Sequence, residues 1–380
     1  MQIAPFEMER WQSVWENRVE LNVSESGVEP MTLRELLGES SDIEKLLNQK
    51  LGYPQTNGSE DLRTKIAALY PGARAENVLL TAGCAEANFL VTWLLTEPGD
   101  EIVFMMPNYM QVHGLAKGFG ATVRPFWLHE NLGWAPDLAE LSQLVTNKTR
   151  IIAICNPNNP TGATLSADAR KAICDAAAKV GAYILSDEVY RGAELDGDTT
   201  PSLWGGYDRL FCTGGLSKAY GLPGLRTGWI VGPSSMMDKL WSYHDYASMA
   251  PTMLTEKLAS TALEPANNAR ILERTRGIVR RQYPIMREWA AKHPGLLTHV
   301  PPRAGAIVWY GYNRPWKSAE IAEELRTRKS VLIQSGIQLG LDGYFRIGYG
   351  GETHALRQAL GRIDEWIEEA SRAAASSQGR

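Results

Sequence analysis

The chain has 380 residues, more than a single hydrophobic core usually supports, so we expect a large domain and a smaller one. Hydrophobic residues make up 44% and charged residues 22%, which excludes a disordered chain, and a formal net charge of −4 gives no basic surface for nucleic acid. Because no apolar run is long enough to span a bilayer and the N-terminus lacks signal-peptide features, we expect no membrane partner, a cytoplasmic location and a small-molecule ligand.

The first 45 residues contain a candidate amphipathic helix. Its apolar positions are Met8, Trp11, Val14 and Trp15, which recur at helical spacing. A helix this short cannot bury its apolar face alone, so we expect it to dock on another element or on a second subunit.

Short apolar runs rich in β-branched residues recur along the next 190 or so residues. They lie at 78–81, 102–105, 151–155, 182–185, 210–213 and 229–231, and helix-like segments separate several of them. The clearest helix follows Ser166, runs through Ala167–Val180 and ends at Gly181. This alternation predicts an α/β fold with a mostly parallel sheet covered by helices on both faces.

Two early strand ends carry candidate site residues. The first predicted strand runs through Gly83, Cys84 and Ala85 into a helix, a layout in which free backbone N–H groups receive a phosphate, although many α/β turns look the same. Tyr109 follows the next strand, where its ring could stack on a cofactor or fill the core. The four cysteines are scattered singly, and no CxxC or Cys/His cluster indicates a metal site.

Polar residues also follow the next two predicted strands. The run NPNNPTG at 156–162 comes directly after 151–155, and Asp187 and Tyr190 follow the strand at 182–185. Ligands of open α/β sheets bind at the carboxyl ends of the strands. A buried acid keeps a pyridine nitrogen protonated, and a tyrosine hydroxyl donates to a phenolate oxygen. Taken singly, the same residues fit a tight turn and an ordinary helix start.

The stretch TGGLSKAYGLPGLRTGW at 213–229 is the most informative one. It places Lys218 and Arg226 just after a predicted strand. Most lysines are solvated surface charges, and Lys218 alone allows that interpretation. A Schiff-base lysine needs an amine of lowered pKa near a fixed phosphate, and an arginine holds a phosphate through paired donors. Lys218 and Arg226 could meet both needs.

After about residue 250 the pattern changes to long helical stretches. These lie at 252–263 and 266–291, and strand candidates follow at 306–310 and 343–349. We expect a second domain to begin there.

Together, the motifs resemble the aminotransferase class I/II family, the aspartate-aminotransferase-like fold type I of pyridoxal-phosphate enzymes. They appear in the order of that family and are Tyr53 with Gly58, Gly83–Ala85, Tyr109, the NPTG at 159–162, the DEVY at 187–190, Ser217-Lys218 with Arg226, and Arg346 in FRIGYG. The resemblance implies a large cofactor-binding domain at 46–265, and a smaller α/β domain formed by residues 1–45 and 266–380.

The resemblance also implies roles for these residues toward pyridoxal 5'-phosphate and an amino-acid substrate. Lys218 would carry the cofactor as a Schiff base and move the substrate proton, Asp187 would face the ring nitrogen, and Tyr190 and Asn159 would contact the ring hydroxyl oxygen. Ser217, Arg226 and the turn at Gly83, Cys84 and Ala85 would hold the phosphate, and Tyr109 would stack on the ring. Arg346 would bind the substrate carboxylate, beside Asn159. Tyr53 would reach the cofactor of a second subunit, which implies a homodimer with shared sites.

Two segments depart from the family pattern. Gly215 stands where the family often has a serine that binds the phosphate, so either one donor is missing or Thr213 replaces it. The segment from Asn22 to Pro30, which flanks the substrate and contains Glu25 and Gly27, is one residue longer before its glycine than the usual family motif. Its motif SxSGV, at residues 24–28, resembles that of capreomycidine synthase, a family member that eliminates water from a hydroxyarginine and cyclises it.

Two functions therefore compete. The first is an aminotransferase that moves an amino group from an amino acid to a 2-oxo acid. The second is a pyridoxal-phosphate lyase or cyclase that acts at the β or γ carbon of a basic or modified amino acid in specialised metabolism. Glu25 bears on the choice, because a carboxylate beside the substrate could bind a guanidinium group, although a solvated loop glutamate is the simpler interpretation.

Overall fold

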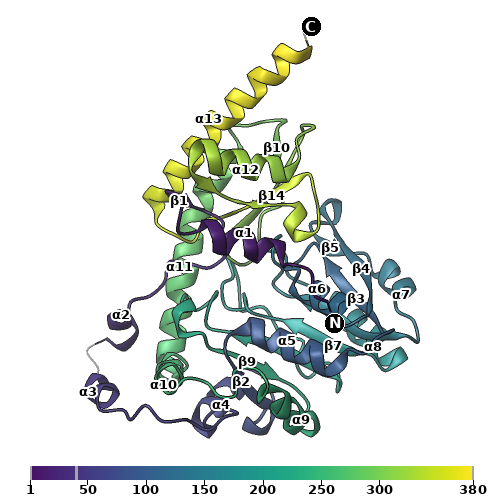
Figure 1. The fold of residues 1–380 in the computed structure, drawn as a ribbon, viewed down its shortest axis with the longest axis vertical. Coiled ribbons are helices and arrows are strands. Elements are labelled where there is room, and N and C mark those ends of the chain that lie inside the picture. Colours follow the sequence, from purple (N-terminus) through teal and green to yellow (C-terminus); the bar gives the residue numbers. More distant parts are fainter. Residues whose placement is uncertain (1, 39–41, 379–380) are drawn as a thin grey trace.

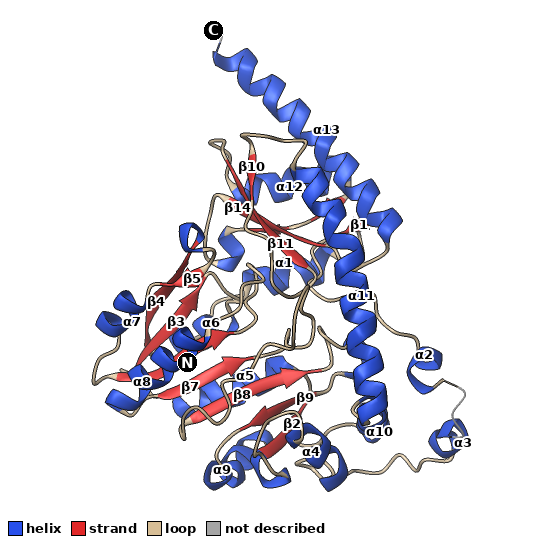
Figure 2. Ribbon diagram, turned by 180° about the vertical axis from the view of Figure 1, so that it is seen from behind, coloured by secondary structure: helices blue, strands red, loops and turns tan. Residues whose placement is uncertain are grey.

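The computed structural model describes residues 2–38 and 42–378, and an eight-stranded sheet lies at its centre (Figures 1 and 2). Its strands are, in spatial order, β2 (Val78–Thr81), β9 (Gly228–Val231), β8 (Leu210–Gly215), β7 (Tyr183–Asp187), β6 (Thr149–Cys155), β3 (Glu101–Met106), β4 (Thr122–His129) and β5 (Ala135–Pro136). Strand β9 is antiparallel to both β2 and β8, and β5 is antiparallel to β4. The other neighbouring pairs are parallel, which confirms the predicted fold class.

Helices cover both faces of this sheet, and each face has its own hydrophobic core. Along β6, Ile151 and Ala153 lie in one core, whereas Ile152 and Ile154 lie in the other, because successive side chains of a strand point to opposite faces. The helices of the first core are α5 (Cys84–Leu95), α6 (Gln111–Gly118) and α9 (Ser234–His244). Those of the second include α4 (Glu60–Ala67), α7 (Leu138–Leu144), α8 (Ala167–Val180) and α10 (Met253–Ala262). All six predicted apolar runs contribute residues to strands of the sheet.

The ends of α8 lie where the sequence predicts them. The Ser166 hydroxyl accepts a hydrogen bond of 3.1 Å from the amide of Ala169, which satisfies a free donor of the first turn. At the other end Gly181 has a φ of 70°, the left-handed conformation that glycine adopts without strain.

A second, four-stranded sheet and three long helices form the other layer of the molecule. The strands are, in order, β10 (Leu297–Thr298), β11 (Ile307–Tyr312), β14 (Tyr344–Gly348) and β13 (Gln334–Ser335). The helices are α11 (Pro265–Ala290), α12 (Ser318–Lys329) and α13 (Thr353–Gln378). None of the helices among the described residues is both long and apolar enough to cross a membrane.

Both ends of the chain enter this second layer. Strand β1 (Leu21–Asn22) pairs in parallel with β12 (Val331–Leu332), and Leu21 and Val23 belong to the same core as α13. Helix α11 runs past both layers, since its Ile271 packs in a core of the large sheet and its Ile278 in that of the small one. The domain limits at 46–265 remain a prediction. Two short helices, α2 (Leu33–Leu37) and α3 (Asp42–Leu47), lie at the side of the molecule (Figure 1).

The N-terminal helix α1 (Glu7–Trp15) lies between the two layers (Figures 1 and 2). Met8 is buried, and the indole N–H of Trp11 donates a hydrogen bond of 3.0 Å to the carbonyl of Ile333. The guanidinium of Arg326 lies 3.8 Å from the centre of the Trp15 ring. The apolar face of this helix is therefore docked on its own chain, one of the two outcomes expected from the sequence.

Candidate active site

A cavity of about 550 Å³ lies between α1 and the carboxyl ends of the large sheet. It is lined by Met8, Glu9, Gln12, Ser13, Glu16, Glu25, Ser26, Cys84, Ala85, Asn88, Tyr109, Cys155, Asn159, Asp187, Val189, Tyr190, Ser217, Lys218, Pro223 and Arg226. Most of the site residues predicted from the sequence are thus brought to one cavity from segments far apart in the chain.

The sheet itself brings the central residues together. Strands β6, β7 and β8 are parallel neighbours, so their carboxyl ends meet at one edge. The register pairs Cys155 with Asp187 and Asp187 with Thr213, and Lys218 follows a few residues after β8. The polar residues that follow these strands therefore lie at one edge of the sheet.

Asp187 is held by the first turns of α5 and by its own loop. Its Oδ2 accepts a hydrogen bond of 2.8 Å from the side-chain amide of Asn88, and its Oδ1 accepts one of 3.1 Å from the backbone amide of Val189. Burial raises the pKa of Asp187, and these hydrogen bonds only partly oppose the rise. A cation placed beside Asp187 in the cavity would stabilise its ionised form.

Lys218 forms an ion pair with Glu25 across the cavity. The distance from its Nζ to Glu25 Oε1 is 2.5 Å. Burial lowers the pKa of Lys218, but the negative charge of Glu25, together with Tyr190, outweighs burial and leaves that pKa above its usual value. The pKa of Lys218 is thus raised and not lowered as a Schiff-base lysine requires, because Glu25 lies in contact with the amine.

Glu25 is held firmly for a residue of an irregular segment. Its Oε1 accepts hydrogen bonds from the backbone amides of Ser26 and Gly27, at 2.9 and 3.1 Å, and its Oε2 accepts one of 2.9 Å from Gln12. The charge of Lys218 lowers the pKa of Glu25 to about 2 against the effect of burial, and the hydrogen bonds from Lys218 and from the Ser26 amide add to this effect. Glu25 is therefore ionised and held at the cavity by hydrogen bonds, although 49% of its side chain is still accessible to solvent.

A concave surface suited to an anion lies at the start of α5. Gly83 has a φ of 90°, and a side chain there would meet the guanidinium of Arg226, 2.6 Å from the position of its Cβ. Arg226 itself has a φ of 46° and lies within 3.5 Å of the Ser217 hydroxyl. The first amides of α5 have no partner within the helix, so donors from three segments face the same space.

Thr213 is not the substitute for the missing phosphate serine. Its hydroxyl is completely buried and donates a hydrogen bond of 2.7 Å to Asn88 Oδ1. At Gly215 a side chain would approach the carbonyl of Thr227 to 3.0 Å and the amide of Cys84 to 3.6 Å. Close packing of β8, β9 and the start of α5 therefore leaves little space there.

Arg346 of β14 is almost completely buried, with 1% of its surface exposed, and does not line the cavity. One guanidinium nitrogen, Nη1, donates a hydrogen bond of 2.6 Å to Asn159 Oδ1, and Nη2 donates one to the carbonyl of Ser24. Its Nε is buried without a hydrogen-bond partner, and burial lowers the pKa of the group. Arg346 therefore contacts the cavity wall through Asn159, which does line the cavity.

Two tyrosines line the cavity with their hydroxyl groups already engaged. The Tyr190 hydroxyl donates to Ser26 Oγ at 2.7 Å, and burial raises the pKa of Tyr190 to about 12. The Tyr109 hydroxyl donates to Glu9 Oε1 at 2.9 Å, and its ring packs edge-on against Phe6 at a centroid distance of 4.9 Å.

The sequence argument missed the contribution of α1 and of Asn88. The helix residues that line the cavity are Glu9, Gln12 and Ser13, with Met8 and the following Glu16. Their spacing of three and four residues was visible in the sequence, but a polar helix face normally points to solvent. Asn88 lies one turn after Cys84 on α5, so the same phosphate-turn motif could have indicated it.

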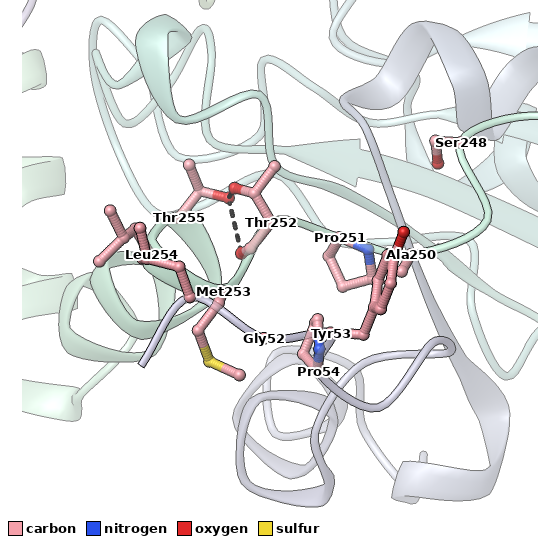
Figure 3. A pocket seen from close by; sticks show the side chains of 11 residues that line it. Gly52, Tyr53, Pro54, Ser248, Ala250, Pro251, Thr252, Met253, Leu254 and Thr255 are labelled. Atoms are coloured by element: carbon pink, nitrogen blue, oxygen red, sulfur yellow. Dashed lines mark hydrogen bonds between the residues drawn. The ribbon is translucent and has the colours of Figure 1, made fainter. Parts of the chain in front are cut away.

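Two further predicted residues lie outside the cavity. Gly27 is buried beside it, and a side chain there would lie 3.4 Å from the carbonyl of Ser217 and 3.7 Å from Lys218 Cδ. Tyr53 is 81% exposed and lines a separate, open hollow with Pro54, Ala250 and Pro251 (Figure 3). Its role at a second subunit's site remains a prediction.

Comparison with known proteins identifies the family. A family model described as aminotransferase class I and II matches residues 29–363. Capreomycidine synthase of Streptomyces vinaceus is 32% identical over 308 residues, which are 81% of this chain and 79% of that protein. An arginine–pyruvate transaminase of Pseudomonas aeruginosa is 30% identical over 331 residues, 84% of each chain. A PLP-dependent aminotransferase structure from Streptococcus suis has a TM-score of 0.91 and 32% identity, covering 97% of this chain and 99% of that one. The chain therefore belongs to the aminotransferase class I and II family, as its motifs predicted.

Proposed function

We propose that this protein is a pyridoxal-phosphate-dependent aminotransferase that moves the amino group of an amino acid to a 2-oxo acid. The observation that carries the proposal is the single cavity in which Lys218, the buried Asp187 and the anion-binding surface around Arg226 meet. Each of these features is common alone, but an amine, an acid and an anion site in one cavity match the three polar ends of this cofactor.

The residues of the cavity fit pyridoxal phosphate. Lys218 would hold its aldehyde carbon, Asp187 its ring nitrogen, and Arg226, Ser217 and the first amides of α5 its phosphate. Tyr109 and Val189 supply aromatic and apolar surface for a flat ring in the same cavity. The raised pKa of Asp187 supports the fit, because a positively charged ring nitrogen is the partner that this buried carboxylate lacks.

When bound, the cofactor supplies an electron sink for the electron pair left at the substrate α-carbon. Around it, this chain positions the groups that handle protons and charge. Lys218 would take the α-proton, and Asp187 would hold the proton of the ring nitrogen. Tyr190 and Asn159 would contact the ring oxygen. Arg346, which Asn159 now contacts, would bind the substrate carboxylate through its planar fork of donors.

A cyclase or lyase is the second candidate, and two observations favour it. Capreomycidine synthase is 32% identical over most of both chains. The segment from Asn22 to Pro30, which departs from the usual aminotransferase motif, also places the ionised Glu25 against Lys218. Both candidates share the first proton removal and differ only in the later steps, because a transaminase needs an amino acceptor and a cyclase does not.

We also propose that two copies of the chain form the working unit. The exposed Tyr53, Leu51 and Leu254 line one open hollow, where apolar surface faces solvent in a single chain (Figure 3). In a homodimer, Tyr53 would leave this exposed position and contribute to the partner's cavity. The assignment rests on the family, whose members pair in this way.

The deciding experiment supplies pooled amino acids to the purified protein with and without 2-oxo acids. We expect an absorbing cofactor in the visible range that borohydride fixes to Lys218, and turnover that requires an oxo acid. A label on another lysine would contradict the site. Catalytic turnover without any oxo acid, with release of a cyclised or eliminated product, would replace the aminotransferase by the second candidate.

A further inference from the structure

Helix α1 has polar residues on two sides, because Glu7 and Arg10 are exposed to solvent whereas a second polar side faces the cavity. Four polar residues at the helical spacing of three and four share one side of the helix and its C-terminal end. All of them line the cavity; they are Glu9, Gln12, Ser13 and Glu16. A neighbouring side of the helix is docked through Trp11, whose indole N–H donates to the carbonyl of Ile333. The carboxylates of Glu9 and Glu16 therefore place negative charge at the cavity and not in open solvent.

The charges on this side of the cavity are unbalanced. Three carboxylates, those of Glu9, Glu16 and Glu25, line it together, and two cations act on them: Lys218 in the ion pair with Glu25, and the buried Arg346. Burial and the neighbouring charges of Glu25 and Glu9 raise the pKa of Glu16. The part of this rise that comes from the two neighbouring carboxylates is one that a cation bound beside Glu16 would oppose.

Glu16 is the carboxylate most available to a ligand. Glu9 accepts the hydroxyl of Tyr109, and Glu25 accepts four donors. The carboxylate of Glu16, in contrast, has no hydrogen-bond or ion-pair partner within residues 2–38 and 42–378.

We infer that Glu16, supported by Glu9 and Glu25, selects amino-acid substrates whose side chain ends in a cation. The inference rests on the proposed function, since it concerns the substrate of the same site. The α-carboxylate and the cofactor phosphate have their own arginines, Arg346 and Arg226. A guanidinium or ammonium at the far end of the substrate is the group that the acidic wall fits, through charge-assisted hydrogen bonds.

The test compares L-arginine with L-citrulline, which has the same shape but a neutral end group. Binding to the protein carrying its cofactor is followed without any oxo acid, from the change in cofactor absorbance and by calorimetry. We expect the wild type to bind arginine at least about tenfold more tightly than citrulline. Glu16→Gln should lower this ratio severalfold by weakening arginine binding, with citrulline binding unchanged.

Glu7→Gln is the matched control, because Glu7 is exposed on the same helix, carries the same charge and does not line the cavity. This variant should keep the wild-type ratio. Equal affinity for arginine and citrulline in the wild type, or an unchanged ratio in Glu16→Gln, would overturn the inference. Either result would leave the proposed function standing as long as borohydride still fixes the cofactor to Lys218. Failure to fix it there would instead remove the proposed function.

Discussion

The side-chain amide of Asn88 donates a hydrogen bond of 2.8 Å to Asp187 Oδ2, and the hydroxyl of Thr213 donates one of 2.7 Å to the side-chain oxygen Oδ1 of Asn88. The three residues come from α5, β7 and β8 and are far apart in the sequence. Asn88 can use its two polar atoms in this way in only one orientation, so the buried hydroxyl of Thr213 fixes the amide that holds the carboxylate. Asp187 is therefore preorganised before any ligand arrives.

Replacing Asn88 with alanine should loosen the cofactor without unfolding the protein. A hydrogen bond to a charged group contributes about 1.5–3 kcal/mol, so we expect cofactor affinity to fall by about ten- to a hundredfold. The measurement is a titration of the apoprotein with pyridoxal phosphate, followed by visible absorbance. Asn147→Ala, at an exposed asparagine, is the control and should bind as the wild type does. An Asn88→Ala protein of normal cofactor affinity would show that Asp187 needs no such support.

Arg346→Lys should weaken amino-acid binding while the cofactor spectrum stays intact. Lysine lacks the planar fork, so it cannot keep both the contact with Asn159 and that with the Ser24 carbonyl while binding a carboxylate. We expect a loss of about 3–5 kcal/mol in binding, as for a buried charged pair with one partner removed. Apparent affinity is read from the cofactor absorbance at increasing amino-acid concentration.

A melting curve separates this effect from general damage, because Arg346 is buried and its replacement also affects packing. If the variant folds and binds amino acids as the wild type does, Arg346 is a structural residue of β14 and another group binds the carboxylate.

Much of the fold and of the cavity could be predicted from the sequence. Elements with strong local patterns were predictable, such as β6 with its β-branched run and α8 with its boundaries at Ser166 and Gly181. Strand β4 escaped prediction because Pro125 and the polar Arg124 interrupt its pattern, yet it pairs in parallel with β3 along its length. Pairing with a strong neighbouring strand overrides weak local propensity.

The site was less predictable where contacts join distant segments. Motif order indicated Lys218 and Asp187, but no local pattern shows that Glu25, 193 residues away, contacts the amine and raises its pKa. The inward polar face of α1 was likewise hidden, because the same spacing describes a helix with its charges in water. Tertiary contacts decided both cases.

The predicted sharing of sites can be tested with mixed dimers. Tyr53→Ala and Lys218→Ala should each inactivate the protein, and we expect a dimer in sedimentation. After subunit exchange of equal amounts, about a quarter of the wild-type sites should be restored, because mixed dimers contain one site with both residues intact. Absence of recovery despite confirmed exchange would mean that each chain uses its own Tyr53 or none.

The last prediction concerns the ion pair of Lys218 and Glu25 before the cofactor binds. An amine must be neutral to bond to an aldehyde, and Glu25 holds the pKa of Lys218 above its usual value. Glu25→Gln removes that charge but keeps the shape, so burial should prevail and lower the pKa of Lys218. The neutral fraction at a given pH rises about tenfold for each unit by which the pKa falls.

We therefore expect apoprotein with Glu25→Gln to recombine with pyridoxal phosphate faster than the wild type at about pH 7–8, and to reach its maximal rate at lower pH. Stopped-flow absorbance measures the rate, and comparing the two proteins at each pH cancels the titration of the cofactor.

A second consequence arises from the pKa of Glu25, which is lowered from 4.5 to about 2. The stability that its carboxylate adds is present above pH 4.5 and disappears as the pH falls toward 2, so the two apoproteins should differ in urea unfolding at neutral pH and converge in acid. Glu7→Gln should behave as the wild type in both measurements. Identical rate profiles for Glu25→Gln and the wild type would show that Glu25 does not control the protonation of Lys218, and its role would then be confined to the substrate.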